Sequence, residues 1–129
     1  MKAECVLDAS AILAVLFAEP GSQKVQEWMR SGAAVSAVNL AEVATELQSF
    51  GVDDEQIHED IEALQLVAVP FDQTLAYLAA RLHRKTFTKG LSLGDRACLA
   101  TASHLGLPAV TADRSWKIAG LGINVQTVR

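Results

Sequence analysis

Two apolar segments of this chain each lead into an aspartate. Residues 5–7 run into Asp8, and residues 107–112 run into Asp113. If both segments are parallel strands, their carboxyl ends share one edge of the sheet, which is where open α/β folds build their sites. We therefore expect the two carboxylates to lie on the same side of the molecule, where they could bind a cation.

Two further acids are expected on that side. Asp95 opens a predicted helix over about 95–105, and Glu42 lies one turn into a predicted helix over 38–50. Carboxylates that converge in a cleft repel one another and raise their own pKa values unless a cation compensates. Carboxylate oxygens select Mg²⁺ or Mn²⁺. None of the three histidines and neither cysteine has zinc-like spacing to another ligand, so a zinc site is disfavoured.

Each of these acids also has an ordinary structural interpretation. Asp8 fits a helix N-cap, and Asp95, three residues after Ser92, fits a capping box. Asp113 fits an Asx turn, and Glu42 fits a solvated helix face. Only their joint placement, at the carboxyl ends of predicted strands and the starts of predicted helices, favours a shared cation site.

The elements that must position these acids alternate along the chain. Apolar runs predict strands at 3–7, 33–36, 66–70, 109–111 and 123–127, and helical periodicity predicts helices between them. This alternation predicts a single domain over residues 1–129 with the α/β class of fold. We expect a three-layer α/β/α sandwich with a mostly parallel sheet of about five strands.

Composition narrows the classes of function. The 129 residues are 50% hydrophobic and 20% charged, with a net charge of −4, which argues against binding nucleic acid by bulk positive charge alone. Without the four acids named above, the remaining 11 acidic residues balance the 11 basic ones. No uncharged run suits a membrane span and no signal peptide is evident, so we expect a cytoplasmic protein without membrane contact. Cys5 and Cys98 are expected to be reduced packing residues.

Four short motifs together resemble a known family. They are VLDAS at 6–10, SAVNLAE at 36–42, LSLGD at 91–95 and TAD at 111–113. In their order and spacing the sequence resembles the PIN-domain family, and within it a VapC-type toxin ribonuclease of a bacterial toxin–antitoxin pair. The resemblance covers essentially the whole chain. Asn39 stands where the family more usually has a threonine.

The resemblance implies hydrolysis of RNA phosphodiester bonds with Mg²⁺ or Mn²⁺. Asp8, Asp95 and Asp113 would be metal ligands, and Glu42 either a ligand or the group that orients the attacking water. Hydroxyls at Ser10 and Thr111 would support the ligands. The family also implies a cognate antitoxin and a homodimer. Candidate partners for the RNA phosphates are the basic residues near the acid-bearing loops, namely Arg84, Lys85, Lys89, Arg96 and Arg114. A solvated helix face explains the basic run over 81–89 equally well.

Two other classes of function stay open. In a phosphatase or receiver, Asp8 would be a nucleophile, but Ser10 stands where such sites place a second acid. A catalytically inert binding module is the other alternative, and in that case Mg²⁺ should not stabilise the fold.

Overall fold

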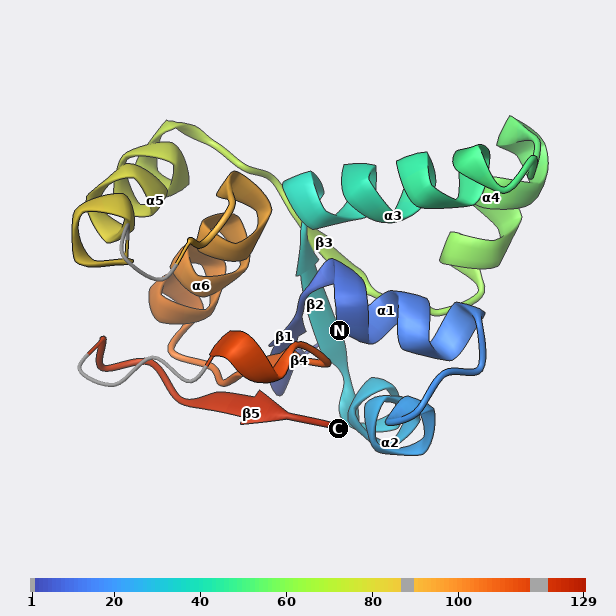
Figure 1. The fold of residues 1–129 in the computed structure, drawn as a ribbon, viewed down its shortest axis with the longest axis horizontal. Helices are drawn as coiled ribbons and strands as arrows, with labels where there is room; N and C mark the ends of the chain where they lie inside the picture. Colours follow the sequence, from blue (N-terminus) through green and yellow to red (C-terminus); the bar gives the residue numbers. More distant parts are fainter. Residues whose placement is uncertain (1, 87–89, 117–120) are drawn as a thin grey trace.

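In the part of the chain that the structure describes, the sheet has five strands, and all of their pairings are parallel. The computed structural model describes residues 2–86, 90–116 and 121–129. Its strands lie in the order β3-β2-β1-β4-β5, with β1 in the centre (Figure 1). Their bounds are β1 Cys5–Leu7, β2 Ala33–Ser36, β3 Val67–Val69, β4 Ala109–Thr111 and β5 Val125–Thr127. The predicted α/β fold with a parallel sheet of about five strands is confirmed.

Helices cover both faces of the sheet. Cys5 and Leu7 of β1 pack into a core with the first four helices, whereas Val6 points to a second core against the last two. The first group is α1 Ala9–Leu16, α2 Ser22–Ser31, α3 Ala37–Ser49 and α4 Asp54–Glu62; the second is α5 Gln73–Thr86 and α6 Leu93–Leu105. A short 3-10 helix, η2 Arg114–Trp116, follows β4. Strands buried on both faces explain why the strand segments are continuously apolar.

Several boundaries differ from the sequence prediction by one or two residues. Helix α6 begins at Leu93 and not at Asp95, because the Ser92 side chain caps it and accepts a hydrogen bond from the Asp95 backbone N–H at 3.1 Å. Strands β1 and β5 begin later than predicted, at Cys5 and Val125. No helix in the described part of the chain is long and apolar enough to cross a bilayer.

Strand register brings distant residues to the carboxyl edge of the sheet. Leu7 in β1 pairs with Val35 in β2 and with Val110 in β4. The next residue, Asp8, donates its backbone N–H to the Val110 carbonyl at 3.1 Å. The ends of β1, β2 and β4 therefore align, and the residues that follow them meet at one edge.

Candidate functional site

Asp8 is the buried acid at the centre of this edge. It ends β1, caps α1 and is 4% exposed. Its Oδ1 accepts hydrogen bonds from the Ala11 backbone N–H at 2.9 Å and from Ser10 Oγ at 2.8 Å. Burial, and to a smaller extent the negative charge of Asp95, raise the pKa of Asp8 from 3.8 to about 6, although the hydrogen bonds from Thr111, Ala11 and Ser10 lower it.

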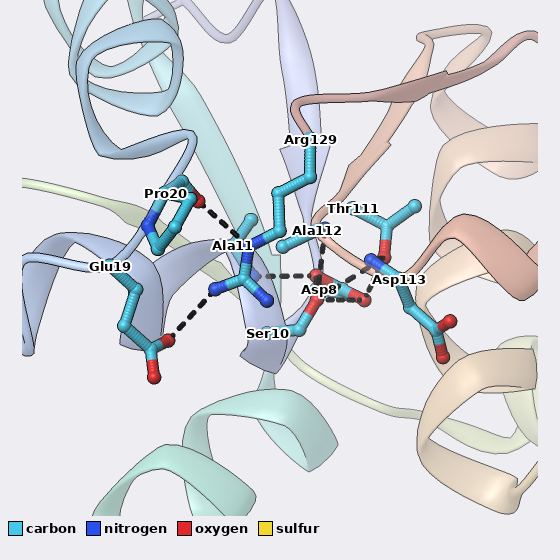
Figure 2. A network of polar contacts seen from close by, with 9 residues as sticks. All are labelled: Asp8, Ser10, Ala11, Glu19, Pro20, Thr111, Ala112, Asp113 and Arg129. Atoms are coloured by element: carbon cyan, nitrogen blue, oxygen red, sulfur yellow. Dashed lines mark hydrogen bonds and ion pairs between the residues drawn. The ribbon is translucent and has the colours of Figure 1, made fainter.

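Two hydroxyls hold the Asp8 carboxylate in place (Figure 2). Thr111 Oγ1 donates to Asp8 Oδ2 at 2.6 Å, and Ser10 Oγ lies 3.2 Å from Thr111 Oγ1. These hydroxyls also accept backbone N–H groups, Ser10 from Ala112 at 3.0 Å and Thr111 from Asp113 at 3.0 Å. The network fixes the orientation of Asp8 across β1 and β4.

Asp113 lies beside this network, but its carboxylate turns elsewhere. Oδ1 of Asp113 accepts hydrogen bonds from the Ser115 backbone N–H at 2.9 Å and from Ser115 Oγ at 2.7 Å. Figure 2 shows the carboxylate directed away from Asp8. The Asx turn anticipated for Asp113 is therefore present, and the side chain is exposed to solvent.

Asp95 lies in the first turn of α6 and is half-buried. Its Oδ2 accepts the Ser92 backbone N–H at 3.0 Å, which completes a capping box with the bond from Asp95 N–H to Ser92 Oγ. The capping role anticipated for Asp95 is thus present. The negative charge of Asp95 raises the pKa of Asp8, so the two acids lie near enough at the edge of the sheet to repel each other.

Glu42 reaches the same region from α3. Asn39, which is 1% exposed, donates from Nδ2 to Glu42 Oε1 at 2.8 Å and to the Gly94 carbonyl at 3.0 Å. The Glu42 carboxylate packs directly over Gly94, where an added Cβ would lie 2.6 Å from Glu42 Cδ. Glu42 is therefore held against the first turn of α6, next to Asp95.

The buried Cys98 thiol lies within the electrostatic reach of three of the acids. Cys98 is fully buried in α6, and burial raises its pKa well above 9.0. The charges of Asp8, Asp95 and Glu42 each raise it further, although these acids belong to three different elements. Both cysteines are free, buried thiols.

The carboxylate oxygens at this edge are of the kind that a hard dication prefers, but in this structure the acids do not surround a common point. No three or more His, Cys, Asp or Glu side chains of the described residues are arranged as a metal-binding group. The hydrogen bonds of Asp95 and Glu42 within the described chain each engage one carboxylate oxygen, which leaves the other for a ligand. A cation would also relieve the repulsion between Asp8 and Asp95.

The basic residues considered for phosphate binding lie in different environments. Arg84 and Lys85 are exposed in the last turns of α5, and Arg114 is exposed in η2. Arg96 instead turns against α5, where its Nη1 donates to the Ala79 carbonyl at 3.1 Å, and its buried Nε has no hydrogen-bond partner among the described residues. Lys89 lies outside the described residues.

Sequence reasoning did not assign Asn39, Gly94 and Cys98 to the site. Asn39 precedes Glu42 by three residues, the spacing that places two side chains on one helix face. This spacing is the sequence signal that could have assigned Asn39 to the site. Nothing in the local sequence indicates that Gly94 faces α3 or that Cys98 lies within the electrostatic reach of the acids.

A parallel α/β sandwich with acidic side chains gathered at the carboxyl edge of its sheet defines the class of this protein. The family model of the PIN domain matches residues 5–120, and the chain belongs to this family. A comparison with curated proteins found no match.

Solved structures with the same fold include toxin–antitoxin complexes. A toxin–antitoxin complex from Klebsiella pneumoniae has a chain with 19% identity and a TM-score of 0.75, covering 97% of this chain and 98% of that one. DNA-bound VapBC from Salmonella typhimurium gives 17% identity and a TM-score of 0.77, with 99% and 100% covered. FitAcB from Neisseria gonorrhoeae gives 22% identity and a TM-score of 0.67, with 96% and 97% covered. At these identities the likeness establishes the fold.

Proposed function

We propose that this protein is a metal-dependent endoribonuclease and the toxin of a toxin–antitoxin pair. The observation that carries the proposal is the placement of three acids in a PIN-domain fold: Asp8 directly after β1, Asp95 in the first turn of α6, and Glu42 packed against that same turn. Acids placed in this way lower the stability of the folded protein when no cation balances their charge, since the pKa of Asp8 is already raised to about 6. A bound dication would offset that cost.

Asp8, Asp95 and Glu42 would hold Mg²⁺ or Mn²⁺, and Asp113 would join them after its side chain leaves Ser115. The chemistry that such an ion supplies when bound is charge stabilisation at the phosphate and activation of water. Ser10 and Thr111 keep the Asp8 carboxylate oriented through the bonds described above. Glu42, exposed on α3, would orient the attacking water or act as a further ligand.

RNA would approach this edge through its phosphates. Arg84 and Lys85 on α5 and Arg114 on η2 are the exposed basic side chains that we propose contact the flanking phosphates. Arg96 is engaged with the Ala79 carbonyl, so we expect it to support the packing of α5 on α6 and not to bind substrate. We place the proposed activity in the cytoplasm.

A cognate antitoxin is the proposed protein partner. The three solved structures described above support it, since they are a toxin–antitoxin complex, VapBC and FitAcB. A groove beside Glu42 is acidic and partly apolar, so it would accept a segment that carries basic and apolar side chains. Its lining residues are Ala37, Val38, Ala41, Glu42, Thr45, Glu46 and Phe71.

We also propose that two copies form a homodimer. Large apolar side chains are exposed on the described surface, among them Phe50 at 67% and Tyr77 at 60%. Phe50 packs against Phe17 with ring centroids 5.1 Å apart and ring planes tilted by 53°. Light scattering of the purified protein gives the mass that tests this assembly.

The test of the nuclease proposal is an RNA cleavage assay with Mg²⁺ or Mn²⁺ that compares the wild type with Asp95→Asn. Asparagine keeps an oxygen that accepts the Ser92 N–H, so the cap is retained while the charge is lost. We expect cleavage to fall at least 100-fold in Asp95→Asn and to stay unchanged in the control Glu27→Gln, an exposed acid on α2. Equal cleavage by wild type and Asp95→Asn, or cleavage that persists in chelator, would rule the mechanism out.

A further inference from the structure

We propose that Asn39 is a positioning residue that orients Glu42 toward the cation site; this inference rests on the proposed function. Asn39 lies in the first turn of α3 and is 1% exposed. Its amide group donates to two acceptors on two helices, Glu42 Oε1 at 2.8 Å and the Gly94 carbonyl at 3.0 Å. Asn39 thus ties the Glu42 side chain to the turn of α6 that carries Asp95.

The amide can hold only one orientation. Turning it over would place the Asn39 oxygen against the Glu42 carboxylate and the Gly94 carbonyl, both of which are acceptors. In the observed orientation, Asn39 Oδ1 is buried and has no hydrogen-bond partner among the described residues. An unpaired buried acceptor lowers stability, and an apolar side chain of the same shape would avoid that loss. What the amide has and an apolar side chain lacks is the hydrogen bond that orients the Glu42 carboxylate.

Gly94 makes this control possible. A Cβ at position 94 would overlap the Glu42 carboxylate, so only glycine lets the carboxylate rest on the backbone of α6. Glutamate has many rotamers on an exposed helix face, and holding one of them costs conformational entropy. The bond from Asn39 and the surface of Gly94 together select a single rotamer. The Glu42 carboxylate is thereby held at the first turn of α6, the turn that carries Asp95, before any ligand arrives.

The decisive variant is Asn39→Leu, which keeps the approximate shape of the side chain and removes both donors. We expect Mn²⁺ affinity, measured by isothermal titration calorimetry, to fall about 10- to 100-fold, the usual effect of losing a group that orients a ligand. In the Glu42→Gln background the same substitution should cause no further loss, since Asn39 acts through Glu42. Losses that multiply in the double variant would overturn the inference.

A second readout needs neither metal nor RNA. The ¹³C chemical shift of the Glu42 carboxyl, recorded in the metal-free protein, should change in Asn39→Leu and stay at the wild-type value in the control Thr101→Val. Thr101 is fully buried in α6 and donates to the Ala97 carbonyl at 2.8 Å, so this control loses a comparable buried polar bond away from Glu42. An unchanged Glu42 shift in Asn39→Leu would overturn the inference.

The two proposals fail separately. Wild-type protein that neither binds Mn²⁺ nor cleaves RNA contradicts the nuclease proposal, and the Glu42 shift then still decides whether Asn39 positions the side chain. Wild-type protein that does both, alongside an Asn39→Leu variant with the same Mn²⁺ affinity, contradicts the inference alone. Thermal unfolding of each variant verifies that it is folded.

Discussion

Thr111 Oγ1 donates a 2.6 Å hydrogen bond to Asp8 Oδ2, although the two residues are 103 positions apart in the chain. The bond exists because β1 and β4 are parallel neighbours in the register that pairs Leu7 with Val110. It joins the two strand ends that carry Asp8 and Asp113.

Replacing the donor in that bond should change the acidity of Asp8. Thr111→Val keeps the side-chain shape but removes a bond that lowers the pKa of Asp8, so we expect this pKa to rise above about 6. A ¹³C NMR titration of the Asp8 carboxyl measures it, with Thr101→Val as the control. We also expect RNA cleavage to fall about 10- to 100-fold. An Asp8 pKa that does not move would contradict this account.

Removing the buried charge should stabilise the protein. The folded-state pKa of Asp8 is raised from 3.8 to about 6, so folding favours the protonated acid, and this group lowers stability progressively as pH rises from 4 to 6. At pH 7, Asp8→Asn should therefore unfold with a higher free energy, by up to about 3 kcal/mol. The gain should shrink toward pH 4. Urea unfolding of both proteins across this range tests the sign.

Glycine at position 94 should be needed for activity but not for folding. In Gly94→Ala the new methyl group displaces the Glu42 carboxylate, so we expect cleavage to fall at least about tenfold. Stability should be equal or higher, because alanine favours a helix over glycine by about 1 kcal/mol. Ser103→Ala, at an exposed position of the same helix, is the control. Full activity of Gly94→Ala would show that Glu42 need not rest on α6.

Binding of Mg²⁺ or Mn²⁺ should stabilise the fold. A ligand present at 100 times its Kd adds about 2.7 kcal/mol to the free energy of unfolding. We expect the Tm of the wild type to rise by several degrees on adding Mn²⁺ and to return with chelator, and we expect Asp95→Asn to show a smaller rise. Equal wild-type Tm values in Mn²⁺ and chelator are the result expected of an inert binding module.

The exposed basic residues at the end of α5 should contribute to RNA affinity through phosphates. If Arg84 and Lys85 each neutralise one phosphate, the double variant Arg84→Ala/Lys85→Ala should bind RNA more weakly. The slope of log K against log salt should flatten by about 1.4. Lys24→Ala/Arg30→Ala on α2 removes the same charge from another exposed helix. Identical slopes in the two double variants would remove Arg84 and Lys85 from the proposed interface.

Local patterns in the sequence were enough to predict the strands and helices and the place of each acid relative to them. Alternating apolar runs and helical periodicity predict five strands and the helices between them, because strands buried on both faces and amphipathic helices leave a periodic trace in the sequence. Capping by Asp8 and Ser92 and the turn at Asp113 depend on neighbours within three residues. Such contacts need no knowledge of the rest of the fold.

The directions of the side chains required the tertiary structure. Arg96 turns to the Ala79 carbonyl, and Glu42 rests on Gly94. The sequence pattern alone predicts that the four acids, Asp8, Glu42, Asp95 and Asp113, lie toward the carboxyl edge of the sheet. The packing of α3 and α5 on α6 and the register of β1 with β4 decided how those residues meet there, because a rotamer is selected by partners that lie tens of residues away in the chain.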